Sequence, residues 1–67
     1  MDIRQRLAQN MRQIRREKGW SQEELADRAD VHRTYISGVE RCVRNPTITI
    51  VGQIADALGV KVGELVD

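Results

Sequence analysis

Three polar side chains, those of Arg33, Thr34 and Ser37, fall on one face of a short predicted helix and could read the edges of DNA bases. A guanidinium group can donate two hydrogen bonds to O6 and N7 of guanine, and a threonine can offer a methyl group to thymine or a hydroxyl to a base edge. Ile36 and Val39 fall on the opposite face, where they would point into the protein. A helix that enters the major groove with its first turns has this pattern.

The helix before it could hold the DNA backbone. Gln22 stands at its N-terminus, where the side-chain amide and the free backbone N–H groups can clamp a phosphate. Ser21 is predicted to cap this helix, with Glu24 reaching back to complete a capping box, and Trp20 and Leu25 match a hydrophobic staple. Because these start signals coincide, we expect the helix to begin here.

The turn between the two helices falls at Asp30, since aspartate tolerates the left-handed conformation better than most residues. His32 is then a weak cap for the second helix. It can also touch a phosphate, and no partner motif makes it a metal ligand or a catalytic base.

Helical spacing predicts three further helices. The first runs from about Asp2 to Lys18, and the fourth begins after a Thr47 cap and ends at Gly59. Their apolar stripes are Ile3, Leu7, Met11 and Ile14 in the first and Ile48, Val51, Ile54, Ala55 and Leu58 in the fourth. A short fifth helix contains Val60, Val62, Leu65 and Val66. We therefore expect one all-α, five-helix domain with a helix-turn-helix over residues 1–67.

The apolar side chains near the C-terminus exceed what so short a helix can bury by itself, which suggests a partner surface. A two-fold dimer would cover it, because such a dimer repeats one surface on both subunits. The residues predicted at this interface are Ile50, Val62, Leu65 and Val66. The alternative is that they only close the small core.

Length and composition exclude several functions. A chain of 67 residues leaves no room for a deep catalytic cleft, and nothing in it assembles a nucleophile, a base and an oxyanion donor. One cysteine and one histidine exclude a disulfide framework and a four-ligand zinc site within the chain, so we expect no metal and no cofactor. No apolar stretch approaches the ~20 residues that span a bilayer, so we expect a soluble protein without a membrane partner.

Charge is unevenly distributed along the chain. Residues 1–44 contain ten basic and seven acidic residues, a net charge of +3, whereas residues 45–67 contain one basic and three acidic residues, a net charge of −2. A basic pole on the first three helices is what a phosphate-facing surface requires. Taken by itself, charge favours the simpler interpretation of a solvated charged face.

From Gln22 to Glu40 the sequence resembles the helix-turn-helix of the lambda-repressor and Cro-like family, also called the XRE family. The similarity continues through the segments 44–47 and 57–60. Within the family, residues 32–41 together with Arg44 and Asn45 look most like the controller proteins of restriction-modification systems, which bind DNA as dimers. The resemblance implies a lambda-repressor-like fold and a phosphate contact for Gln22. It also implies contacts with the backbone or groove edge from four further residues: Tyr35, Arg41, Arg44 and Asn45.

The leading hypothesis is therefore a homodimeric regulator of transcription that binds a roughly palindromic, double-stranded operator. The resemblance implies a bacterial or phage protein of the cytoplasm, associated with the nucleoid, with RNA polymerase as a further candidate partner. The alternative is an antitoxin-type interaction module that binds DNA only with a toxin. The sequence shows no tail beyond the fifth helix to wrap a toxin, which counts against that alternative.

Four other positions have two interpretations each. Gly38 could allow DNA to approach closely or could fill a tight contact inside the protein. Glu40 is expected to pair with a basic residue rather than to read a base. Arg44 could contact DNA or be a solvated loop residue. Cys42 would be strained if the chain turns left-handed there, and the other possibility is a different path of the loop. Weaker candidates for DNA contact lie on the first helix, away from its apolar line: Arg12, Arg15 and Arg16.

Overall fold

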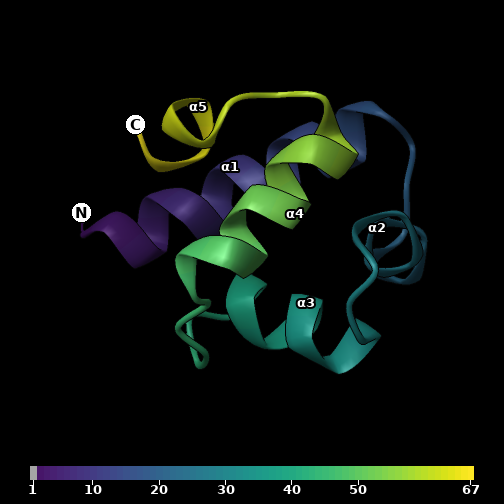
Figure 1. The fold of residues 1–67 in the computed structure, drawn as a ribbon, viewed down its shortest axis with the longest axis horizontal. Helices are drawn as coiled ribbons and strands as arrows, with labels where there is room; N and C mark the ends of the chain where they lie inside the picture. The colour runs from purple at the N-terminus through teal and green to yellow at the C-terminus, as the bar shows by residue number, and fades with distance from the viewer. Residues whose placement is uncertain (1) are drawn as a thin grey trace.

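The computed structural model describes residues 2–67, which form five α-helices and no strand (Figure 1). Their bounds are α1 (Ile3–Glu17), α2 (Gln22–Ala29), α3 (Arg33–Glu40), α4 (Ile48–Leu58) and α5 (Val62–Val66). α5 folds back against α1, so both chain ends lie on the same side of the molecule, while α3 lies at the opposite edge from α5 (Figure 1). In the described part, no helix has the length and apolar character needed to cross a membrane.

The helix boundaries follow local signals. Asp2 caps α1, and its carboxylate accepts the backbone N–H groups of Arg4 and Gln5; the hydrogen bond from Gln5 is the main reason why the pKa of Asp2 lies below its ordinary value. A Schellman motif ends α1 at Gly19, which has φ +74°. The Gly19 N–H donates to the Arg16 carbonyl, and the Trp20 N–H donates to the Arg15 carbonyl.

The predicted caps of α2 and α4 are confirmed, but the capping box at α2 is only half formed. Ser21 Oγ accepts the Glu24 N–H at 3.0 Å, and Thr47 Oγ1 accepts the Ile50 N–H at 3.2 Å. The Glu24 carboxylate instead pairs with Arg28 of the same helix at 2.7 Å. A charged partner one turn away competes successfully with the backbone N–H of the cap.

The core is formed by apolar side chains from all five helices, and its largest fully buried members are Met11, Leu25, Ile36, Val39, Ile54, Leu58 and Leu65. One prediction about burial and one about a helix boundary are wrong. Ile48 was expected in the buried stripe of α4 but is 74% exposed, because it is the first residue of the helix and lies beyond the core. The fifth helix begins at Val62, so Val60 precedes it.

The prediction that Leu65 lies on a dimer surface is also wrong. Leu65 is 0% exposed within a single chain. The carbonyl of Leu65 accepts a hydrogen bond from Asn10 Nδ2 at 2.8 Å, which ties α5 to α1. The other three predicted interface residues, Ile50, Val62 and Val66, are half-buried.

Candidate nucleic-acid interface

A tight left-handed turn directs α3 away from α2. Asp30 has φ 58° and ψ 44°, as predicted, and the Val31 N–H donates to the Ala26 carbonyl at 3.0 Å. Val31 and Ile36 then pack on the core side of the turn, with Ile36 fully buried. The turn therefore leaves the outer face of α3 uncovered by α2.

The three predicted base-reading residues lie on this outer face. Arg33 and Thr34 are exposed and Ser37 is half-buried, whereas Ile36 and Val39 are buried as expected. Their side chains are short or flexible and lie on the first two turns of a helix that is held in place by its buried residues Ile36 and Val39. A duplex groove could reach them without any change in the fold.

Two contacts hold these side chains in the free protein. The Arg33 guanidinium lies 3.9 Å from the Glu23 carboxylate of α2, with both groups well exposed. His32 caps α3 through Nδ1, which accepts the Thr34 N–H at 3.2 Å and lies 2.8 Å from Thr34 Oγ1. The cap by His32 was predicted and is confirmed, whereas the contact of Arg33 with Glu23 was not predicted.

Gln22 is linked to a buried ion pair beneath the interface. Glu40 accepts two hydrogen bonds from Arg15, Nε at 2.8 Å and Nη2 at 3.0 Å, and a third from Gln22 Nε2 at 3.1 Å. The side chains of Arg15 and Glu40 are only 10% and 2% exposed. Glu40 thus fixes one end of the Gln22 amide at the N-terminus of α2.

The same ion pair decides between two predictions. Glu40 is a structural partner of a basic residue, as expected. Arg15 does not offer its guanidinium to DNA. The group is buried and donates hydrogen bonds to Glu40 and, at 2.8 Å, to the Trp20 carbonyl. The prediction that placed Arg15 among solvent-facing arginines is therefore wrong; Arg16 is exposed, and Arg12 is half-buried with a 3.5 Å contact to the Glu40 carbonyl.

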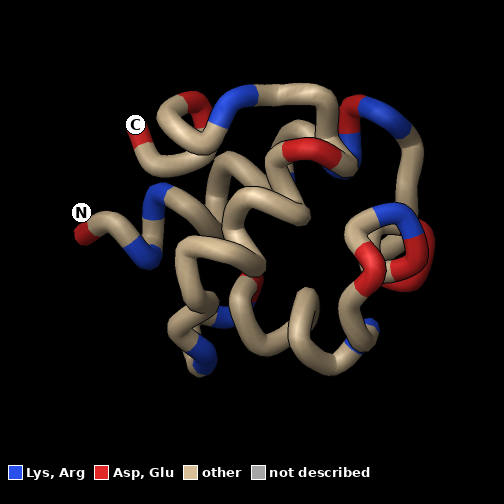
Figure 2. The backbone as a smooth tube through the Cα atoms, viewed as in Figure 1, with Lys and Arg blue, Asp and Glu red and all other residues tan. Residues whose placement is uncertain are grey.

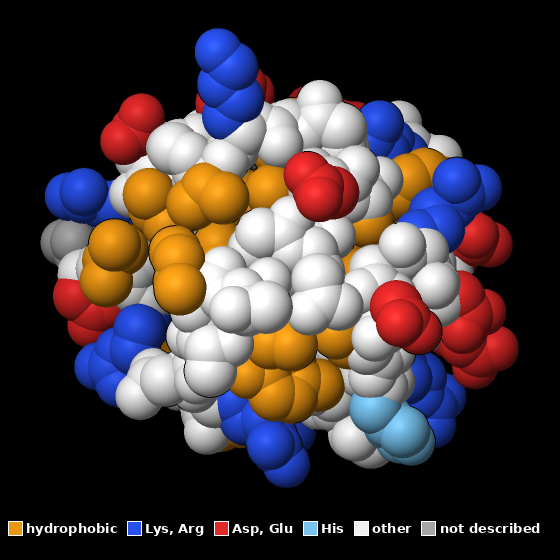
Figure 3. Space-filling view, in the orientation of Figure 1, with side chains coloured by type: hydrophobic (Ala, Val, Ile, Leu, Met, Phe, Trp, Pro, Cys, Tyr) orange, Lys and Arg blue, Asp and Glu red, His pale blue; other side chains and the backbone are white. Residues whose placement is uncertain are grey.

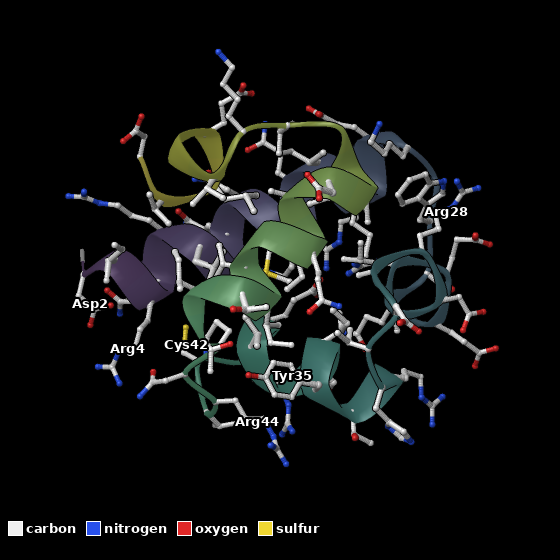
Figure 4. The ribbon with its side chains drawn as sticks, viewed as in Figure 1. Asp2, Arg4, Arg28, Tyr35, Cys42 and Arg44 are labelled. Carbon is white, nitrogen blue, oxygen red and sulfur yellow. The ribbon has the colours of Figure 1, made fainter. Side chains whose placement is uncertain are left out.

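The loop after α3 carries the remaining candidates. Cys42 has φ 61°, so the chain does turn left-handed there, and its thiol lies 3.7 Å from the Arg4 carbonyl. Arg41, Arg44 and Asn45 are exposed, and the Arg44 guanidinium lies over the Tyr35 ring, 5.4 Å from its centroid. Figure 4 shows Arg44 and Tyr35 together at the lower edge of the molecule.

Charges around this surface are segregated. Acidic positions gather on α2, whereas basic positions stand at the start of α3 and in the loop that follows it (Figure 2). Within residues 2–67, no three histidine, cysteine or acidic side chains come close enough to hold a metal ion. The segregation of charge means that a polyanion would meet basic side chains at both ends of α3, together with hydrogen-bond donors along the helix.

Sequence reasoning missed two groups that shape the site. Trp20 is half-buried, with the Arg28 guanidinium 4.2 Å and the Lys18 ammonium 5.2 Å from its ring centroid. Gly38 makes a tight contact inside the protein, which was one of its two interpretations, but its partner, the Arg44 side chain, was not predicted. The positions of Lys18 and Arg28 on either side of Trp20 in the sequence could have suggested the cation–π contacts. No residue near Gly38 in the sequence predicts its contact with Arg44.

Comparisons with known proteins agree with this geometry. A helix-turn-helix family model, HTH_3, matches residues 11–65. The control protein C.BamHI of Bacillus amyloliquefaciens is 46% identical over 67 residues, covering 98% of this chain and 83% of that protein.

Solved structures show the same fold. A hypothetical transcription factor from Neisseria superposes with a TM-score of 0.95 at 47% identity, over 98% of this chain and 76% of that one. SinR, a master regulator for biofilm formation solved in complex with DNA, superposes with a TM-score of 0.86 at 39% identity, over 91% of this chain and 98% of that one.

Proposed function

This chain belongs to the HTH_3 family of XRE-like helix-turn-helix transcriptional regulators, with a lambda-repressor-like fold, and from that premise we propose that it acts as a homodimer on a roughly palindromic operator. In this proposal α3 enters the major groove, where Arg33, Thr34 and Ser37 read bases. Gln22, at the N-terminus of α2, binds a phosphate. The observation that carries the proposal is that Arg33 and Thr34 stand exposed on a helix whose opposite face is buried.

The backbone contacts come from both ends of the reading helix. Gln22 and His32 precede or begin it, and Tyr35, Arg41, Arg44 and Asn45 lie along it or follow it. These residues are exposed or half-buried, so each has surface to offer a phosphate. Contacts of this kind set the register of the protein on the duplex and carry no base information of their own.

An apolar groove beside the chain ends supports the dimer. It has a volume of about 500 Å³ and is lined by Asp2, Ile3, Arg4, Leu7, Asn45, Pro46, Ile48, Val51 and Val66. Figure 3 shows apolar side chains gathered on this side of the molecule. We propose that Ile48, which is 74% exposed, joins Ile50, Val62 and Val66 at the interface in place of Leu65.

A two-fold dimer through this surface would present two α3 helices to successive major grooves, about 34 Å apart, which requires an operator with two inverted half-sites. The similarity to a control protein of a restriction-modification system favours that subclass. RNA polymerase bound at the same promoter is a further proposed partner, and DNA binding would keep the protein at the bacterial nucleoid.

A mobility-shift assay with the purified protein alone tests this function. The probes are the DNA upstream of its own gene and an unrelated duplex of equal length and base composition. We expect a discrete complex on the upstream DNA at concentrations at least about a thousandfold below those needed for the unrelated duplex. Binding that appears only after a second protein is added would favour the antitoxin alternative.

A further inference from the structure

Gly38 occupies a helical position that does not require glycine for its backbone conformation. Among the glycines of residues 2–67, a positive φ occurs at Gly19 and Gly59, both at helix ends. Gly38 lies in the interior of α3, where alanine is a much better helix former. Another constraint must therefore account for a residue without a side chain at this place.

The side chain of Arg44 fills the space that a larger residue would need. A Cβ atom built on Gly38 would lie 2.9 Å from both Cγ and Cδ of Arg44, and 3.3 Å from its Nε. These separations are well inside the usual carbon–carbon contact distance of about 3.5–4.0 Å. The stem of Arg44 thus lies directly on the backbone of α3.

The backbone of the loop holds Arg44 at the same residue. The Gly38 carbonyl accepts the N–H of Val43 at 2.9 Å and the N–H of Arg44 at 3.2 Å. The left-handed Cys42 makes this return of the chain possible. From this position the Arg44 guanidinium reaches the ring of Tyr35, one turn before Gly38 on α3 (Figure 4).

We propose that Gly38 is a positioning residue: by lacking a side chain it lets Arg44 lie across α3 against Tyr35, and so directs the guanidinium to the DNA beside the base-reading face. This proposal rests on the DNA contact proposed above for Arg44. The competing explanation is that Gly38 itself lets the DNA approach α3 closely.

A double-mutant cycle separates the two explanations. Gly38→Ala, Arg44→Ala and the double variant are compared by fluorescence anisotropy on the DNA upstream of the gene. We expect Arg44→Ala to weaken binding about tenfold, the loss of one charge-assisted hydrogen bond. Gly38→Ala should weaken it at least about threefold by displacing Arg44, and should have no effect in the Arg44→Ala background, as coupled residues behave. An equal loss in both backgrounds, or no loss in the wild-type background, overturns the proposal.

The matched control is Gly52→Ala on α4. It makes the same substitution within a helix, and nothing lies within 4 Å of the added Cβ atom. We expect it to keep wild-type DNA binding and, like Gly38→Ala, to remain folded by circular dichroism. If Gly38→Ala unfolds the protein, refolding in the double variant supports the contact with Arg44, and an unfolded double variant overturns it.

An NMR measurement of the free protein distinguishes failure of the positioning from failure of the DNA contact. The Arg44 side-chain resonances should show the ring-current shift of Tyr35, and both Gly38→Ala and Tyr35→Leu should remove it. If the shift disappears in Gly38→Ala but Arg44→Ala binds DNA normally, the positioning stands and the DNA contact of Arg44 is wrong. An unchanged Arg44 spectrum in Gly38→Ala overturns the positioning itself.

Discussion

Arg15 and Glu40, twenty-five residues apart in the chain, form a bidentate ion pair that is almost completely buried between α1 and the end of α3. Gln22 donates a further hydrogen bond to Glu40, and the Trp20 carbonyl accepts one from Arg15. A buried charge is tolerated only when its partners are complete, and removal of one partner leaves the other charge uncompensated.

We therefore predict that Glu40→Gln lowers the free energy of unfolding by about 3–5 kcal/mol, because it leaves the Arg15 guanidinium buried without its counter-ion. A domain of this size has about 3–5 kcal/mol in total, so the variant should be largely unfolded at room temperature. Urea titration followed by circular dichroism measures the change.

Glu24→Gln is the matched control for that variant. Glu24 pairs with Arg28 at 2.7 Å, but the two side chains are 46% and 51% exposed. Exposed pairs contribute less than about 1 kcal/mol, so this substitution should change stability little. Equal effects at the two positions would show that burial of the Arg15 pair has no energetic consequence.

Arg33→Ala should weaken binding to the operator by about 1–3 kcal/mol and relax discrimination at one base pair of each half-site, because it removes the proposed bidentate base contact. The measurement is a binding titration on a set of operators with single substitutions. If affinity for operator and random DNA falls by the same factor, Arg33 contacts only phosphate.

Glu23→Gln should strengthen DNA binding by up to about 1 kcal/mol, because it releases Arg33 from an exposed ion pair and removes a negative charge near the phosphates. Asp56→Asn, an exposed acid on α4, is the charge-matched control. Equal gains in the two variants would indicate that net charge alone matters and that the 3.9 Å contact does not restrain Arg33.

Ile48→Asp should yield a folded monomer with much weaker operator binding, because the residue is exposed in one chain and lies in the proposed interface. Sedimentation equilibrium at tens of micromolar measures the association. Val43→Asp, at a 66% exposed apolar residue outside the groove, should leave association unchanged, whereas Leu65→Asp should unfold the chain. A wild-type protein that sediments as a monomer at these concentrations would contradict the dimer.

Cys42→Gly should raise the free energy of unfolding by somewhat less than about 1 kcal/mol. It relieves the left-handed strain at φ 61°, and the greater freedom of glycine in the unfolded chain offsets part of the gain. Cys42→Ala removes the thiol without relieving the backbone and serves as the control. Similar stabilities for the two variants would show that strain at this position is negligible.

Local signals were enough to predict the ends of α2 and α4 and the end of α1, whereas the start of α5 was predicted wrongly. Ser21, Thr47, Gly19 and Gly59 act through hydrogen bonds or φ values within a few residues of themselves, so the sequence nearby contains the whole cause. The exposed face of α3 was predictable for the same reason, since helical periodicity places Ile36 and Val39 opposite Thr34.

Contacts between distant segments were not predictable in this way. Leu65 is buried because α5 returns to α1, where Asn10 holds its carbonyl, across fifty-five positions of sequence. Ile48 matches the periodicity of α4 but stands at the end of the helix, beyond the core. The guanidinium of Arg15 is buried because it forms an ion pair with Glu40, which is twenty-five residues away in the sequence.

The ion pair of Arg15 and Glu40 also has a consequence for how two subunits could adapt to one operator. It joins α1, the N-terminus of α2 and the end of α3 around a single carboxylate, so the reading helix cannot tilt independently of the rest of its subunit. In a dimer of such stiff units, the duplex must bend or twist to bring both half-sites into register. Base pairs at the operator's centre, touched by neither subunit, would then affect affinity through the flexibility of the DNA itself.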